Sequence, residues 1–141
     1  MSPDPRSSAT GPVRTASTLA RVLGRLKRDA DLSLTEAITL LAIAENEGIT
    51  TSDLARVCGY TIATASRSAR GMLGPNDPGA LHPFRGLVLM RMGPIDNKRR
   101  HLFLTPAGRR LCEHLDTLLD RPISPILMET PPLPHRWLDA S

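Results

Sequence analysis

Aromatic residues are scarce in this chain of 141 residues, which has one Trp, one Tyr and two Phe. Hydrophobic residues nevertheless make up 40% of the sequence, so the core must consist mainly of Leu, Ile, Val, Ala and Met. This composition favours helices over a β-sandwich. A chain of this length suits one domain, which can bury most of its apolar surface without disulfides.

Long hydrophobic runs are also absent. No stretch approaches the roughly 18–20 apolar residues that are needed to span a bilayer, and the segment MSPDPRSSATGP lacks the apolar centre of a secretory signal. The two cysteines, Cys58 and Cys112, form neither a disulfide framework nor a CxxC metal motif. These absences predict a protein of a reducing cytoplasm that has no membrane partner.

Constellations typical of catalysis are missing as well. The four histidines are scattered without HxH or HxxxH pairing, which disfavours a metal site. No serine lies in a GxSxG context, and there is no phosphate-binding loop. We therefore expect no enzymatic activity, no cofactor and no metal. Cys58 and Cys112 are expected to be small buried hydrophobes, with redox sensing as the alternative.

Positive charge is concentrated in the middle of the sequence. The stretch from Arg56 to Arg110 holds ten basic and two acidic residues, whereas the remainder holds eight basic and twelve acidic residues. A block of one sign on a small domain favours a polyanionic partner. Charge alone fits a solvated basic surface equally well, so the choice depends on the motifs.

Hydrophobic periodicity predicts four helices, a β-hairpin and a fifth helix. The helices are expected over residues 15–29, 35–47, 51–58, 61–73 and 105–121, and the strands over 87–92 and 101–104, with a turn-rich loop over 74–86. We expect residues 1–13 to be a flexible arm, 14–120 to be the folded domain and 121–141 to be a Pro-rich tail. Thr35 is the expected N-cap of the second helix.

The segment 54–73 has the features of a helix-turn-helix, in which the second helix lies in the DNA major groove. Gly59 supplies the positive φ of the turn and Thr61 caps the second helix. We expect Leu54, Ala55, Val57 and Cys58 of the first helix, and Ala65, Ala69 and Met72 of the second, to face inward. The outward face carries no acid and consists of Thr61, Ala63, Thr64, Ser66, Arg67 and Arg70. Either arginine could pair with guanine or clamp a phosphate.

Together with the basic hairpin GPIDNKRRHLFLTPAG, this segment resembles the winged helix-turn-helix of MarR-type transcriptional regulators over residues 34–119. The matching points are Leu34-Thr35, Leu54-Ala55, and Asp96 eight residues before Leu104-Thr105, with Gly108 following. The resemblance implies a mainly α fold with a small β-hairpin wing. It also implies wing contacts with DNA from Lys98, Arg99 and Arg100, and a brace between Asp96 and a nearby arginine. We expect a homodimer that forms through residues 15–29, residues 111–119 and the tail.

The predicted function is that of a sequence-specific regulator, a repressor that binds double-stranded DNA as a homodimer in the bacterial cytoplasm at the nucleoid. One alternative is a winged-helix module that binds a protein, with weak or no specific DNA contact. A second is a nonspecific nucleoid-type binder, which would respond to salt without preferring a sequence. A small-molecule effector is compatible with the resemblance, but the sequence gives no positive sign of one.

Overall fold

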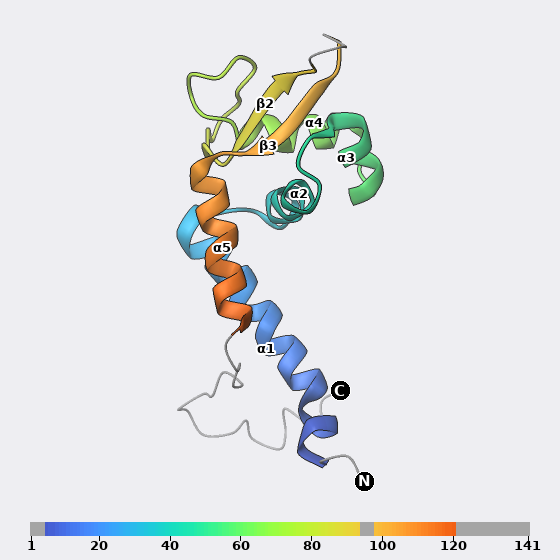
Figure 1. Cartoon of the computed structure of the whole chain (residues 1–141), viewed down its shortest axis with the longest axis vertical. Coiled ribbons are helices and arrows are strands. Elements are labelled where there is room, and N and C mark those ends of the chain that lie inside the picture. The colour runs from blue at the N-terminus through green and yellow to red at the C-terminus, as the bar shows by residue number, and fades with distance from the viewer. Residues whose placement is uncertain (1–4, 94–97, 121–141) are drawn as a thin grey trace, which may run out of the picture.

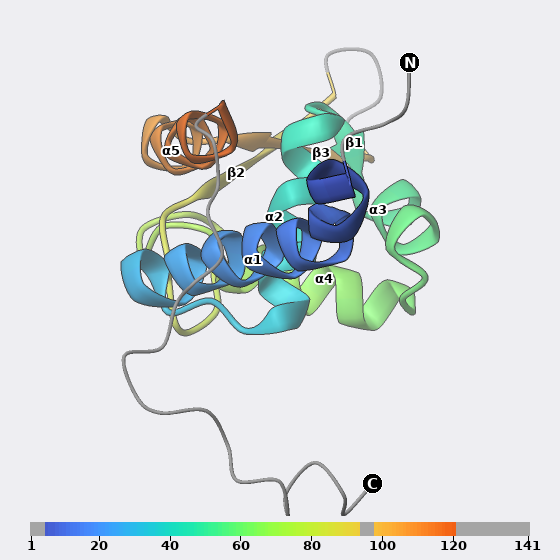
Figure 2. The same cartoon turned by 90° about the horizontal axis from the view of Figure 1, so that it is seen from below.

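The computed structural model describes residues 5–93 and 98–120, and within them the chain forms five α-helices and one small antiparallel sheet (Figure 1). The elements are α1 (Pro5–Ala30), α2 (Leu34–Glu45), β1 (Ile49–Thr50), α3 (Thr51–Cys58), α4 (Ile62–Gly71), β2 (Val88–Met92), β3 (Arg100–Leu104) and α5 (Pro106–Asp120). In Figure 1, α1 and α5 extend away from the sheet, while α3, α4 and the β2–β3 hairpin lie at the opposite end from the start of α1. Figure 2 looks from the α1 side, with α2, α3 and α4 beyond it. The mainly α fold with a β-hairpin wing is therefore confirmed.

Helix α1 begins earlier than the sequence indicated. Residues 5–13, which composition predicted to be a flexible arm, belong to this helix of 26 residues. Pro5 stands at its first position, where the missing N–H of proline is no loss. The prediction depended on the high content of Pro, Ser, Gly and Thr in this segment, which is typical of flexible arms. None of the helices in the described ranges combines the length and the apolar character that a membrane crossing requires.

Helix α2 lies centrally and is capped two residues before the expected position. The Ser33 side chain accepts a hydrogen bond from Glu36 N, and the Glu36 carboxylate accepts one from Ser33 N, both at 3.1 Å. This reciprocal pair is a capping box, so the predicted N-cap, Thr35, already lies inside the helix. Leu40 and Ile43 are completely buried, which explains the almost continuous apolar pattern of this segment.

The sheet has the strand order β1–β3–β2, and its hairpin was predicted to within one residue. Strand β1 was not predicted, because a strand of two residues is too short to show alternation. It pairs Ile49 with Leu102, and β2 pairs Val88 with Leu104. The ring nitrogen Nδ1 of His101 lies 2.7 Å from Gly48 O and so adds a side-chain contact between β3 and the segment before β1.

The start of α5 packs directly on the backbone that leads into β2. Thr105 Oγ1 donates to Gly86 O at 2.7 Å and accepts from Gly108 N at 3.0 Å. Thr105 N donates to Leu87 O at 3.0 Å. The Thr-Pro signal for a helix start is thus confirmed, and Thr105 also fixes the helix to the sheet.

Arg85 joins three parts of the fold that are distant in sequence. Its Nε and Nη2 donate to the two carboxylate oxygens of Glu36, at 3.0 and 3.3 Å, and its Nη1 donates to Ala30 O at 2.9 Å. Its backbone N–H donates to Gly71 O at the end of α4. The side chains of Arg85 and Glu36 are only 18% and 14% exposed. One residue therefore connects the end of α1, the start of α2 and the end of α4.

Candidate nucleic-acid interface

The turn between α3 and α4 has the geometry that the sequence predicted. Thr50 caps α3 by accepting a hydrogen bond from Asp53 N at 3.2 Å, and Thr61 caps α4 by accepting one from Thr64 N at 3.1 Å. Gly59 has φ 72°, in the left-handed region, and its N–H closes the end of α3. Two short helices thus meet at a fixed angle through a turn that glycine makes easy to form.

The inward faces of α3 and α4 are largely those expected. Ala65, Ala69 and Met72 are completely buried, and so is Leu54, with Ala55 at 3% exposure. Val57 is an exception. It was expected to face inward, but its side chain is 57% exposed. The buried face of α3 is centred on Leu54 and Ala55, and Val57 lies outside that face. Cys58 is half-buried.

The outward face of α4 carries both exposed and half-buried side chains. Thr61, Ala63 and Arg67 are exposed, whereas Thr64, Ser66 and Arg70 are half-buried. Arg67 makes no hydrogen bond or ion pair with any described residue. Arg70, in contrast, donates from Nε to Gly79 O at 2.6 Å and is held against the loop that follows α4. The two arginines that the sequence treated alike therefore differ in their surroundings.

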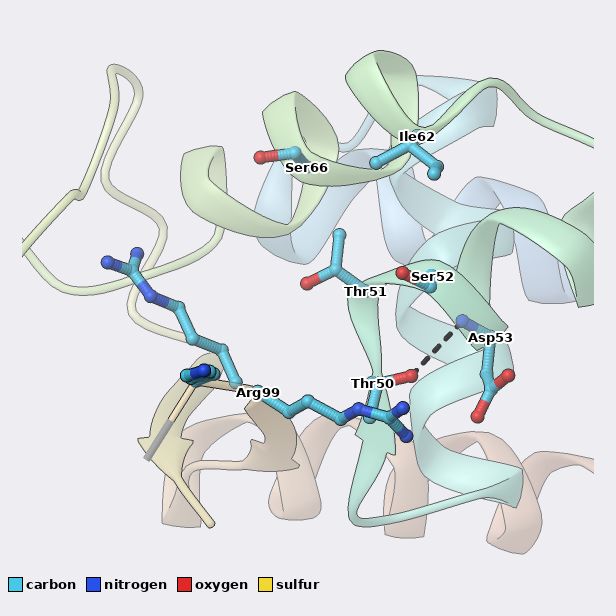
Figure 3. Close-up of a pocket in the computed structure, with 9 residues that line it drawn as sticks. Thr50, Thr51, Ser52, Asp53, Ile62, Ser66 and Arg99 are labelled. Atoms are coloured by element: carbon cyan, nitrogen blue, oxygen red, sulfur yellow. Dashed lines mark hydrogen bonds between the residues drawn. The ribbon is translucent and has the colours of Figure 1, made fainter. Parts of the chain in front are cut away.

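A groove of about 430 Å³ separates α4 and the start of α3 from the wing. Its lining residues are Thr50, Thr51, Ser52, Asp53, Ile62, Ser66, Lys98, Arg99 and Arg100. In Figure 3, Ile62 and Ser66 of α4 lie across from Thr51 and Ser52, and Arg99 reaches from the wing towards Thr50 and Asp53. The structure therefore brings one predicted residue of α4, Ser66, together with all three predicted wing cations.

The groove has the chemistry of a phosphate-binding surface. Hydroxyl groups of Thr51 and Ser52 lie at the first turn of α3, where backbone N–H groups point outward and favour anions. Lys98, Arg99 and Arg100 supply positive charge from the other side. The one acid in the lining, Asp53, pairs with Arg56 at 2.9 Å. Such a groove can hold a strand of the nucleic-acid backbone between α3 and the wing.

Sequence reasoning missed Thr51 and Ser52 as members of this surface. The signal was present, because Thr50, Thr51 and Ser52 form a run of hydroxyl residues at a helix start. Asp96, the expected brace of the wing, lies outside the described residues. The DNA contacts of Thr61, Ala63, Thr64, Ser66, Arg67, Arg70, Lys98, Arg99 and Arg100 stay predictions.

Both cysteines lie on partly covered faces rather than in a reactive setting. Cys58 and Cys112 are half-buried. Burial raises the pKa of each thiol, and the neighbouring carboxylates of Asp116 and Glu47 raise the pKa of Cys112 further. A thiol with a raised pKa carries little thiolate at neutral pH and is a poor redox sensor.

Comparison with known proteins identifies the fold. No protein-family model matches the sequence, and no curated protein matches it. The structure is similar to a mutant of S. aureus MepR bound to an oligodeoxyribonucleotide, with a TM-score of 0.62, 19% identity, and coverage of 81% of this chain and 76% of that chain. It also resembles a MarR transcriptional regulator from Methanosarcina mazei Go1, with a TM-score of 0.55, 14% identity, and coverage of 80% and 73%. A MarR family regulator from Rhodococcus sp. RHA1 gives a TM-score of 0.52 at 20% identity over 82% of this chain and 70% of that chain.

The chain thus has the winged helix-turn-helix fold of MarR family transcriptional regulators. This is the fold that the helix-turn-helix and the hairpin predicted.

Proposed function

We propose that this protein is a sequence-specific transcriptional regulator that binds double-stranded DNA, with α4 in the major groove and the wing on the flanking backbone. The observation that carries the proposal is the groove that Ser66 of α4 shares with Lys98, Arg99 and Arg100 of the wing. It supports one continuous binding surface, on which the outward residues of α4 and the cationic wing face the same ligand. The solved structures of similar fold that contain DNA support the same ligand.

In this proposal α4 contacts the bases, whereas the wing contacts the phosphates. Arg67 is exposed and has no partner among the described residues, so its guanidinium is available for a bidentate pair with guanine. Ala63 and Thr64 are small and allow α4 to approach the bases. Lys98, Arg99 and Arg100 contact phosphates, which adds affinity for any sequence.

A homodimer is the assembly that we propose. Leu19 and Leu23 lie on one face of α1 and are 55% and 41% exposed, and Leu119 near the end of α5 is 47% exposed. Leucines this exposed on the two helices that extend from the body favour burial against a second copy. A symmetric dimer reads a pseudo-palindromic operator. We propose that the protein acts as a repressor by occupying that operator.

The test of the proposal is selection of duplexes from a random library, followed by affinity measurements over a range of salt. We expect one enriched motif with two inverted half-sites. Its affinity should exceed that of a shuffled duplex by a factor on the order of 10³ or more. Binding without a preferred motif would identify a nonspecific nucleoid-type binder. If the protein bound no duplex, the alternative of a winged-helix module that binds a protein would be favoured.

Replacement of Arg67 by alanine is expected to weaken binding to the selected duplex about tenfold or more, because a bidentate arginine–guanine pair contributes about 1–3 kcal/mol. Affinity for a shuffled duplex should change much less. Fluorescence anisotropy with both duplexes measures the difference. The Arg67→Lys variant is the matched control, since it keeps the charge but not the fork. Equal losses on both duplexes would assign Arg67 to a phosphate instead.

The triple variant Lys98→Ala, Arg99→Ala and Arg100→Ala is expected to weaken binding to selected and shuffled duplexes by the same factor. Three lost phosphate contacts should reduce the slope of log affinity against log salt by about 3. The slope is measured over roughly 50 to 200 mM salt. An unchanged slope would show that the wing does not touch the backbone.

A further inference from the structure

The loop of residues 74–86 is held against the end of α4 by backbone hydrogen bonds. The carbonyl oxygens of Arg70, Gly71 and Met72, at the end of the helix, accept from the N–H groups of Leu81, Arg85 and Leu87 at 2.9, 3.1 and 2.8 Å. The loop therefore acts as a backbone cap for the recognition helix. In Figure 1 it forms the lobe beside β2, at the same end of the molecule as the wing.

Two guanidinium groups from different elements meet at Gly79 in this loop. Arg70 of α4 donates from Nε to Gly79 O at 2.6 Å. A Cβ placed on Gly79, whose φ is 80°, would lie 3.5 Å from Arg70 Nε and 3.6 Å from Arg100 Nη1. Arginines of α4 and of β3 therefore both reach Gly79, and its positive φ is the reason that this position favours glycine. We call Arg70, Gly79 and Arg100 the loop junction.

The positive charge of the loop junction is not neutralised within the described part of the chain. Neither arginine forms an ion pair there, and the other contact of Arg100 is a weak one, from Nη1 to Met90 Sδ at 3.7 Å. Asp77 lines one small hollow together with Arg100, and its Oδ2 accepts a hydrogen bond from Gly74 N at 2.9 Å. The two guanidinium groups therefore have one carboxylate near them, and the net charge of the junction stays positive. Two like charges held together repel one another, and an anion placed between them removes that cost.

The position of the junction indicates which anion it binds. Arg100 lines both the groove between α3, α4 and the wing and a smaller hollow of about 150 Å³ beside the loop. The hollow is lined by Leu73, Asp77, Pro78, Met90, Arg91, Met92 and Arg100. The cationic surface therefore continues from the wing onto the loop. An extended polyanion can follow such a path, whereas a small anion would occupy one end of it.

We propose that the loop junction binds a backbone phosphate of the DNA duplex, so that the loop is a third DNA-contacting element beside α4 and the wing. This inference rests on the proposed function. It assigns Arg70 to the phosphate backbone, in place of the choice between base and phosphate that the sequence left open. Arg67 is then the one arginine of α4 that reads a base.

The test is the double variant Arg70→Gln and Arg100→Gln. We expect it to weaken binding to selected and shuffled duplexes by the same factor, about tenfold, and to reduce the salt slope by about 2. The ratio of the two affinities should stay that of the wild type. The matched control is Arg28→Gln with Arg110→Gln, which removes the same charge from exposed positions on α1 and α5. Thermal unfolding verifies that both double variants are folded.

A scan with neutral methylphosphonates identifies the phosphate itself. At one phosphate in each half-site, the neutral replacement should lower the affinity of the wild-type protein for the duplex. The same replacement should leave the affinity of the Arg70→Gln, Arg100→Gln variant unchanged. Wild-type binding with a steep salt slope, together with an unchanged slope in the double variant, would overturn the loop contact and leave the proposed function intact. A reduced affinity ratio would overturn it too, because Arg70 would then read a base. No duplex binding by the wild type would instead refute the proposed function.

Inorganic phosphate distinguishes a free anion from the DNA backbone. If the junction serves DNA, phosphate should compete with the duplex only through ionic strength, as chloride does. Saturable phosphate binding at this site, seen by NMR and unaffected by bound duplex, would assign the junction to a small phosphorylated ligand and contradict the proposal.

Discussion

Replacement of Gly108 by alanine is expected to destabilise the fold by about 3 kcal/mol or more, because the new methyl group has no room. A Cβ at this position would lie within van der Waals overlap of the Leu87 carbonyl oxygen, and its distance to the Leu87 carbonyl carbon would be 3.1 Å. The overlapping group is backbone, and its oxygen also accepts the hydrogen bond from Thr105 N. The first turn of α5 would have to move away from β2.

Chemical and thermal unfolding measure this effect. We expect Tm to fall by about 10 °C or more, or the protein to be recovered unfolded. The matched control is Gly71→Ala, also a buried helical glycine, where the nearest atoms to a new Cβ are Pro83 Cδ at 3.6 Å and His82 O at 3.7 Å. That variant should be as stable as the wild type, or more stable by up to about 1 kcal/mol. Equal stability of both variants would show that α5 does not contact the Leu87 backbone.

Replacement of Arg85 by alanine is expected to cost about 2–3 kcal/mol of unfolding free energy, because it leaves the half-buried Glu36 carboxylate without its cation and Ala30 O without its donor. The structure offers a matched control in Arg109→Ala. Arg109 also pairs with a glutamate, Glu47, but the two side chains are 54% and 29% exposed. An ion pair of that exposure contributes less than about 1 kcal/mol.

The contribution of Arg85 is also expected to depend on pH. Burial raises the pKa of Glu36, but hydrogen bonds from Arg85 and Ser33 outweigh it, so the pKa lies below the ordinary value of 4.5. A carboxylate with a lowered pKa stabilises the fold above its unfolded pKa and loses that effect as pH falls through the folded pKa. The difference in unfolding free energy between wild type and Arg85→Ala should therefore shrink as pH drops from neutral to below 4.5. A constant difference would mean that Arg85 acts through packing alone.

Most of the fold could be predicted because its elements carry local signals. Gly59, Thr61 and the Thr105-Pro106 pair fixed element boundaries through their own backbone preferences. The errors have the same local origin. The Pro-, Ser- and Gly-rich composition of residues 5–13 concealed the start of α1, and Thr35 is as good a cap by residue type as Ser33, the observed one. Strand β1 exists only because β3 lies beside it, which no pattern within two residues can reveal.

The residue types of the site could be predicted from the sequence, but the hydrogen-bond partners of its arginines could not. Outward positions on α4 follow from helical periodicity, and the cations of the wing follow from composition. The different surroundings of Arg67 and Arg70 could not be predicted in this way, because Arg70 is held by the carbonyl oxygen of Gly79, nine residues further along the chain. The bonds from Arg85 to Glu36 and Ala30 span 49 and 55 residues and are equally invisible in the sequence. Contacts of this range require the fold to be known first.

The cap on the end of α4 has a consequence for protein engineering. Main-chain N–H groups of the loop donate to the carbonyl oxygens of Arg70 and Gly71, and Leu87 N, just after the loop, donates to Met72 O. The number of residues between α4 and β2 therefore matters more than which side chains fill the loop. Residues at the loop apex can be exchanged without moving α4, whereas insertions and deletions shift every anchoring bond. Libraries of fixed length at the apex should therefore leave the position of α4 unchanged, whereas a change of one residue in loop length should disturb it.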